Sequence, residues 1–132
     1  MLDGDIVTFA DYSEQVYSNF SNDYIAALMT TKNQDNSRWV SSPHFSYWTL
    51  EALEDFTNFC IEAYSNKNIL DKLEEKYQGH IENNKPGGIC DMTLLYLWSK
   101  DNPKVANPTR VMNNMTLDIN INSSTNYLED EY

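Results

Sequence analysis

Basic residues are scarce in this sequence. Nine lysines and arginines stand against 20 aspartates and glutamates, which gives a formal net charge of −11. Nucleic acids and anionic membranes are bound through positively charged surfaces, because phosphate groups need lysine and arginine as partners. The composition therefore argues against nucleic-acid binding and against attachment to an anionic membrane. The excess of carboxylates suits a cation site, and it is equally typical of a solvated acidic surface.

Long hydrophobic runs and paired cysteines are also missing. No stretch reaches the ~20 apolar residues that a membrane span needs, and acidic residues rather than a signal-peptide core follow Met1. The two cysteines, Cys60 and Cys90, lack CxxC spacing, so we expect reduced thiols. These features predict a cytoplasmic protein without a membrane span.

Aromatic side chains, by contrast, are plentiful, with nine tyrosines and three tryptophans in 132 residues. This content argues against disorder and is enough for one hydrophobic core. We expect a single α/β domain over 1–121 and an acidic, frayed tail over 122–132.

The chain alternates between segments typical of strands and of helices. We expect strands at 2–9 and 24–29, an extended aromatic segment at 39–48, helices at 11–20, 50–64, 68–79 and 89–98, a connector at 101–108 and a hairpin at 110–121. This order predicts a small mixed sheet with three to four helices.

The helix at 50–64 has the clearest signals. Thr49 is a good N-cap, and the apolar stripe expected to face the core consists of Leu50, Leu53, Phe56, Cys60 and Tyr64. In the next helix we expect Asn68 at the cap and Gly79 near the end.

Asp3-Gly4-Asp5 follows an apolar start and precedes Ile6-Val7. Two carboxylates at positions i and i+2 can reach one hard cation if the chain turns at the intervening glycine. A cation there would neutralise the charge that develops on a leaving diphosphate. The competing interpretation is a solvated acidic turn.

Asp91 follows Gly87-Gly88 and stands in the first turn of the apolar helix at 89–98. The glycines would let the backbone approach a ligand closely, and a carboxylate in an apolar helix is costly unless it is paired or faces a cleft. The competing interpretation is an aspartate that interacts favourably with the helix dipole.

His44 and Trp48 lie in the aromatic segment at 39–48. The imidazole could bind a sugar hydroxyl or phosphate, and Trp48 could stack on a sugar face. A histidine packed among core aromatics is the alternative. His80 has no partner at ligand spacing, and we expect it on the surface.

Taken in order, these segments resemble the C-terminal half of a GT-A fold glycosyltransferase, in particular poorly characterised bacterial members. The stretch from Leu2 to Val7 resembles the DxD strand, and Gly87-Gly88-Ile89-Cys90-Asp91-Met92 resembles a helix start that carries an acidic residue facing the acceptor. The segment at 39–64 resembles the part after the acceptor-side strand, and 117–122 resembles a later strand at the site.

The resemblance implies transfer of a sugar from a nucleotide-sugar donor to a hydroxyl acceptor, glycan or lipid-linked, with Mn²⁺ or Mg²⁺. It assigns the metal to Asp3 and Asp5, the general base to Asp91 if the enzyme inverts, and substrate contacts to the residues His44, Trp48, Gly87 and Gly88. The nucleotide-binding half of that fold has no counterpart in this sequence, nor has the family's C-terminal metal-ligating histidine. We therefore expect a truncated protein that is weakly active or inactive alone and that self-associates through an exposed strand edge at 2–9.

A hypothesis from another class is a non-enzymatic, acidic protein-interaction domain. The aromatic side chains would then form a core or a partner surface, and the aspartates would only keep the protein in solution. This hypothesis predicts that Asp5 and Asp91 point away from each other.

Overall fold

The computed structural model describes residues 11, 13–20, 23–30 and 39–108. This part of the chain contains four helices and a three-stranded sheet. In chain order the elements are α1 (Ser13–Phe20), β1 (Ala26–Thr30), β2 (Ser41–Trp48), α2 (Leu50–Ala63), α3 (Lys67–Glu82), α4 (Asp91–Ser99) and β3 (Val105–Ala106). The predicted α/β class, with a small mixed sheet and three to four helices, is confirmed at this level.

The central strand of the described sheet is β1. The strand order is β2-β1-β3, with β1 antiparallel to β2 and parallel to β3. Ala26, Ala27, Leu28 and Met29 are all fully buried, as expected for a strand covered on both faces. The β1–β2 pairing shifts register between Ala27 and Met29, next to Pro43 on the outer strand, where a proline costs no ladder hydrogen bond.

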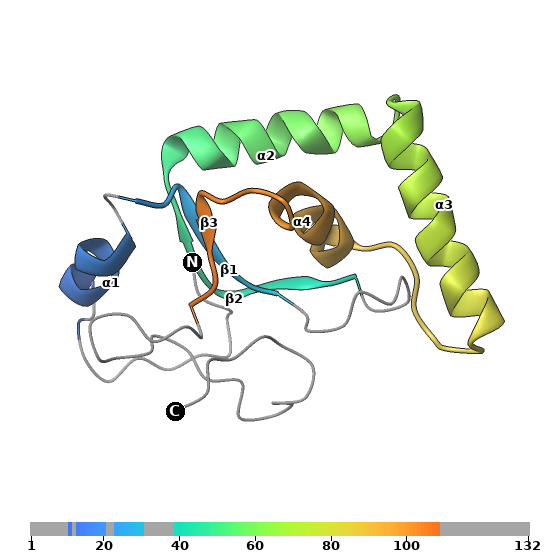
Figure 1. Cartoon of the computed structure of the whole chain (residues 1–132), viewed down its shortest axis with the longest axis horizontal. Coiled ribbons are helices and arrows are strands. Elements are labelled where there is room, and N and C mark those ends of the chain that lie inside the picture. Colours follow the sequence, from blue (N-terminus) through green and yellow to red (C-terminus); the bar gives the residue numbers. More distant parts are fainter. Residues whose placement is uncertain (1–10, 12, 21–22, 31–38, 109–132) are drawn as a thin grey trace.

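Alternate residues of the sheet face two different helical layers. On one face, Ala26 and Leu28 pack with Ala52 of α2 and with Leu95 and Trp98 of α4. On the other face, a cluster of buried residues joins the sheet to α1, namely Phe20, Ala27, Tyr47 and Ala106. The strand period of two therefore explains how β1 serves both layers. Figure 1 shows α4 between α2 and the sheet, with α3 leading away from the far end of α2.

The segment at 11–20 forms α1 as predicted. Asp11 lies just before the helix and accepts hydrogen bonds at Oδ1 from the backbone N–H of Ser13 (2.9 Å) and from its hydroxyl (2.7 Å). These hydrogen bonds lower the pKa of Asp11, because they favour the charged carboxylate.

The start of α2 is confirmed, and the predicted apolar stripe is confirmed only in its middle, where Phe56 and Cys60 pack against the core. Thr49 caps the helix, with its hydroxyl accepting from the backbone N–H of Ala52 at 3.2 Å. The two ends of the expected stripe are exposed, Leu50 by 86% and Tyr64 by 70%. The face toward the core instead carries Ala52, Phe56, Phe59, Cys60 and Ala63. The helix is turned because the two alanines, which are fully buried, permit a closer approach than leucine or tyrosine would.

The helix α3 begins and ends differently from the prediction. Asn66 is the N-cap, and its side chain accepts from the backbone N–H of Asn68 at 3.0 Å. The helix continues past Gly79 to Glu82, and the left-handed residue after it is Asn84, with φ of 49°. Asparagine tolerates this conformation and can end a helix as glycine does.

Some of the remaining predicted elements lie within the described residues and can be compared with the structure, and others lie outside them. The strand expected at 24–29 is β1, the extended segment at 39–48 contains β2, and the helix at 89–98 is α4. The connector at 101–108 contains the short strand β3, which local pattern could not predict because it exists through pairing with β1. The strand at 2–9, the hairpin at 110–121 and the tail at 122–132 lie outside the described residues. Within the described part, no helix is long and apolar enough to cross a membrane.

Candidate functional site

Asp91 is the first residue of α4 and is exposed, whereas most of the helix after it is buried. Thr93 anchors this helix start: it is fully buried, and its hydroxyl lies 3.5 Å from the backbone nitrogen of Cys90, which donates to it. In the described part of the chain, the Asp91 carboxylate pairs with no cation and accepts no hydrogen bond. Its carboxylate thus lies at the positive end of the helix dipole.

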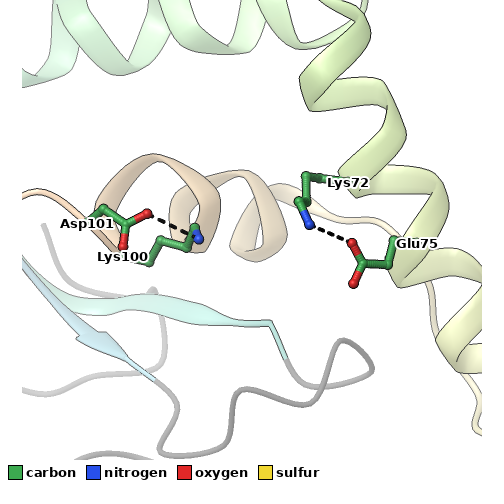
Figure 2. Close-up of polar contacts among 4 residues, drawn as sticks. All are labelled: Lys72, Glu75, Lys100 and Asp101. Carbon is green, nitrogen blue, oxygen red and sulfur yellow. Dashed lines mark hydrogen bonds and ion pairs between the residues drawn. The ribbon is translucent and has the colours of Figure 1, made fainter.

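The described ion pairs lie elsewhere. Figure 2 shows Lys100 with Asp101 just after α4 (3.1 Å) and Lys72 with Glu75 on α3 (2.7 Å). Both pairs are exposed at the surface, where ion pairs contribute little to stability. Neither pair involves a residue at the start of α4.

The diglycine before α4 forms a turn that packs against α3. Gly87 has φ of +116°, a conformation that L residues rarely adopt. A Cβ added to Gly87 would lie 3.3 Å from Cε1 of His80, and one added to Gly88 would lie 3.9 Å from Cδ2 of Tyr77. The two glycines thus bring the backbone close to a histidine and a tyrosine of the same molecule.

His80 is not the surface residue that we expected. Both of its ring nitrogens are buried, and neither has a hydrogen-bond partner among the residues that the structure describes. The ring borders an open hollow of about 580 Å³, lined by Tyr77, His80, Ile81, Asn84, Lys85, Pro86 and Gly87. Its helical spacing could have revealed this, because His80 follows buried Leu73 and Lys76 at i+7 and i+4 on the same helix face.

Replacing Gly87 should show how strongly this turn is constrained. We expect Gly87→Ala to lower the free energy of unfolding by about 1–3 kcal/mol, because alanine would carry the strain of a positive φ and crowd the His80 ring. Gly88→Ala is the matched control, since its Cβ would meet only an ordinary contact. Urea denaturation followed by circular dichroism measures both variants, and equal stability of the two would contradict this role for Gly87.

Trp48 belongs to the core and not to the start of α4. Its ring stacks on Trp98 with centroids 5.4 Å apart, lies 5.8 Å from the ring of Phe56, and its Nε1 donates to Oγ of Ser46 at 2.9 Å. Trp98 follows Asp91 by about two helical turns, or roughly 10 Å along α4. Stacking of Trp48 on a sugar stays a prediction, and the structure gives this ring aromatic partners of its own.

The other predicted site residues are not placed by the structure. Asp3 and Asp5 lie outside the described residues, and of His44 only the backbone, within β2, is described. A pocket shared by Asp3, Asp5 and Asp91 therefore stays a prediction. Among the described residues, no group of three or more histidine, cysteine, aspartate or glutamate side chains could hold a metal ion.

The cysteines offer little chemistry. Cys60 and Cys90 are free thiols, and burial raises the pKa of the Cys60 thiol, which disfavours the nucleophilic thiolate. Cys90 is exposed, and so is Asp91, which follows it at the start of α4. Comparison with protein-family models, with curated proteins and with solved structures finds no match for this chain.

Proposed function

We propose that this chain belongs to a metal-dependent glycosyl-transfer system and that Asp91 acts as the general base. The observation that supports the proposal is the exposed carboxylate of Asp91, which has no ion-pair partner in the described part of the chain, at the start of a helix that is otherwise largely buried. A base that takes a proton from a substrate hydroxyl must be accessible and must not already be neutralised by a partner. The turn at Gly87 and Gly88, which precedes this helix start, packs against His80 and Tyr77 of α3.

In the proposed reaction, the acceptor hydroxyl attacks the anomeric carbon of the donor sugar. Asp91 takes the hydroxyl proton as the new glycosidic bond forms, and the bond from the sugar to the nucleoside diphosphate breaks. Asp3 and Asp5 would hold Mn²⁺ or Mg²⁺, since carboxylate oxygens suit these hard cations. The cation would supply neutralisation of the charge on the departing diphosphate.

Of the other assigned residues, Gly87, Gly88 and His44 would contact substrate directly, and Trp48 would act from the end of β2. Gly87 and Gly88 would bring backbone groups close to the acceptor, and His44 would contact a sugar hydroxyl or a phosphate. Trp48 would support the end of β2, because its ring already packs on Trp98 and Phe56.

Calorimetry with Mn²⁺ and UDP-sugars tests the proposal. We expect the wild-type chain to bind UDP-sugars weakly and saturably in the presence of Mn²⁺. This binding should be lost in Asp3→Ala/Asp5→Ala. It should be retained in Asp91→Asn, because Asp91 is proposed to act on the acceptor and not on the donor. Glu51→Ala/Glu54→Ala is the matched control, since it removes two other exposed carboxylates. Mn²⁺ binding that is unchanged in the Asp3/Asp5 variant, or absent from the wild type, would overturn the proposal.

A second candidate is a non-enzymatic, acidic protein-interaction domain. One observation favours it: the long helix α2 leaves large apolar side chains exposed, among them Leu50, Ile61 and Tyr64. Single exposed apolar residues are ordinary, whereas contiguous ones mark interaction surfaces. Binding of a protein partner without any Mn²⁺-dependent nucleotide binding would favour this candidate over glycosyl transfer.

A further inference from the structure

The helix α2 has two faces that carry apolar residues, and the core clusters of the described residues use one of them. The inner face carries Ala52, Phe56 and Ala63, which pack against the sheet, α3 and α4. Outside this face, large apolar or aromatic residues stand at positions 50, 53 and 61 and at the C-cap, 64, with a threonine at 57, and this spacing of three and four places them on one side of the helix. In Figure 1, α2 runs along the upper edge of the described fold, with α4 beneath it.

We call the second face the outer stripe, formed by Leu50, Leu53, Thr57, Ile61 and Tyr64. Leu53 is the least exposed of its large apolar side chains, at 37%, and Ile61 is exposed by 69%. The Thr57 hydroxyl donates to the backbone carbonyl of Leu53 at 2.7 Å, so the polar part of this side chain is already satisfied by the helix itself. The outer stripe thus carries four large apolar or aromatic side chains over about 21 Å, at 1.5 Å per residue, with Thr57 between them.

A row of carboxylates runs beside the outer stripe on the same helix. Its members are Glu51, Glu54, Asp55 and Glu62, and all four residues are exposed. No ion pair in the described part of the chain involves any of them. Asp55 accepts a hydrogen bond from Nε1 of Trp98 at 2.8 Å. This hydrogen bond places Asp55 next to α4. The acidic row thus lies between the outer stripe and α4.

We propose that the outer stripe is a docking site for a basic amphipathic helix of a partner protein. An apolar stripe four turns long matches the anchors of a partner helix of about 15 residues, and the acidic row would pair with lysine and arginine beside those anchors. Charge complementarity of this kind sets partner choice and speeds association. The proposal is independent of glycosyl transfer, since it uses neither Asp91 nor a metal.

Charge also argues against the obvious competing occupant. A second copy of this chain laid on the stripe would bring two acidic rows together, in a protein whose net charge is −11. Like charges across an interface disfavour association. A basic helix removes this repulsion and turns the same carboxylates into binding partners.

Fluorescence anisotropy with a labelled peptide tests the proposal. The probe is a helical peptide of about 18 residues with leucine on one face and lysine on the other, and the control peptide has the same composition in an order that gives no apolar face. We expect the amphipathic peptide to bind at least about tenfold more tightly than the control peptide, because apolar anchors carry most of the affinity. Affinity should fall as salt is added, because the acidic row contributes through charge.

Variants separate the outer stripe from the rest of the surface. Leu50→Asn/Ile61→Asn should weaken peptide binding by about tenfold or more, and Glu51→Gln/Glu62→Gln should weaken it and flatten its salt dependence. The matched control is Leu70→Asn/Ile81→Asn on α3, where the replaced side chains are also exposed, and its affinity should not change.

Three results would overturn the proposal. One is equal affinity of the stripe variant and the wild type, and another is equal affinity for the two peptides, which would mean that charge alone attracts them. The third is a dimer in analytical ultracentrifugation that the stripe variant abolishes, since the occupant would then be a second copy. Circular dichroism spectra of all variants confirm that the fold is retained, as expected for substitutions at exposed positions.

Discussion

Trp98→Ala is expected to lower the free energy of unfolding by about 3–5 kcal/mol. Trp98 is buried near the end of α4, where its ring stacks on Trp48 and lies 5.5 Å from the ring of Phe56. Its Nε1 also donates to Oδ2 of Asp55 at 2.8 Å. One side chain thus joins the sheet, α2 and α4, and alanine would leave a large cavity among all three.

Chemical denaturation of Trp98→Ala and Trp98→Phe measures this loss of stability and separates the contribution of packing from that of the hydrogen bond. Phenylalanine keeps much of the aromatic packing and loses the hydrogen bond to Asp55, so we expect a smaller loss of about 1–2 kcal/mol. If Trp98→Ala lowered the free energy of unfolding by less than about 1 kcal/mol, the Trp98 ring would not be essential to the core. Such a small loss would mean that the surrounding residues collapse into the cavity or were loosely packed.

Phe20→Ala is expected to cost a similar amount, about 3–5 kcal/mol, on the opposite face of the sheet. Phe20 is fully buried, stacks on Tyr47 with ring centroids 5.5 Å apart, and meets Tyr24 edge-on at 6.2 Å. It lies at the end of α1, a helix of eight residues. Because so short a helix is marginal in isolation, we expect α1 to depend on this side chain for its position on the sheet.

Hydrogen exchange measured by mass spectrometry locates the effect of Phe20→Ala. Exchange in 13–20 should speed up more than exchange in α4, since α4 packs on the other face of the sheet. Glu14→Ala is the control, an exposed change on the same helix that should cost well under 1 kcal/mol. Uniform acceleration across all elements would show instead that α1 and the remainder unfold as one unit.

Elements with strong local signals could be predicted from the sequence. Thr49 predicted the start of α2, and Gly87-Gly88 predicted the turn before α4. Both signals can be read from sequence because capping and turn preferences depend only on neighbouring residues. The position of Asp91 at a helix start follows from the same signals. Its exposure and its lack of an ion-pair partner in the described part depend on the packing of the whole domain.

Features that arise from tertiary packing were missed. The periodicity of α2 offers two apolar stripes, and only contact with the sheet decides that Ala52 and Ala63 face inward. Burial of His80 depends on how α3 meets the turn at Gly87. The stacking of Trp48 on Trp98 could not be predicted either, because the two residues are 50 positions apart in the chain.

The parallel pairing of β1 with β3 has a consequence for how the chain reaches its native state. Ala26 pairs with Val105, so the ladder between them closes only after nearly the whole described chain has been made. Contacts of such wide sequence separation slow folding, because the entropy of the closed loop is lost before the contact is gained. We infer that α2, α3 and α4 form early and that addition of β3 to the sheet is a late event of folding.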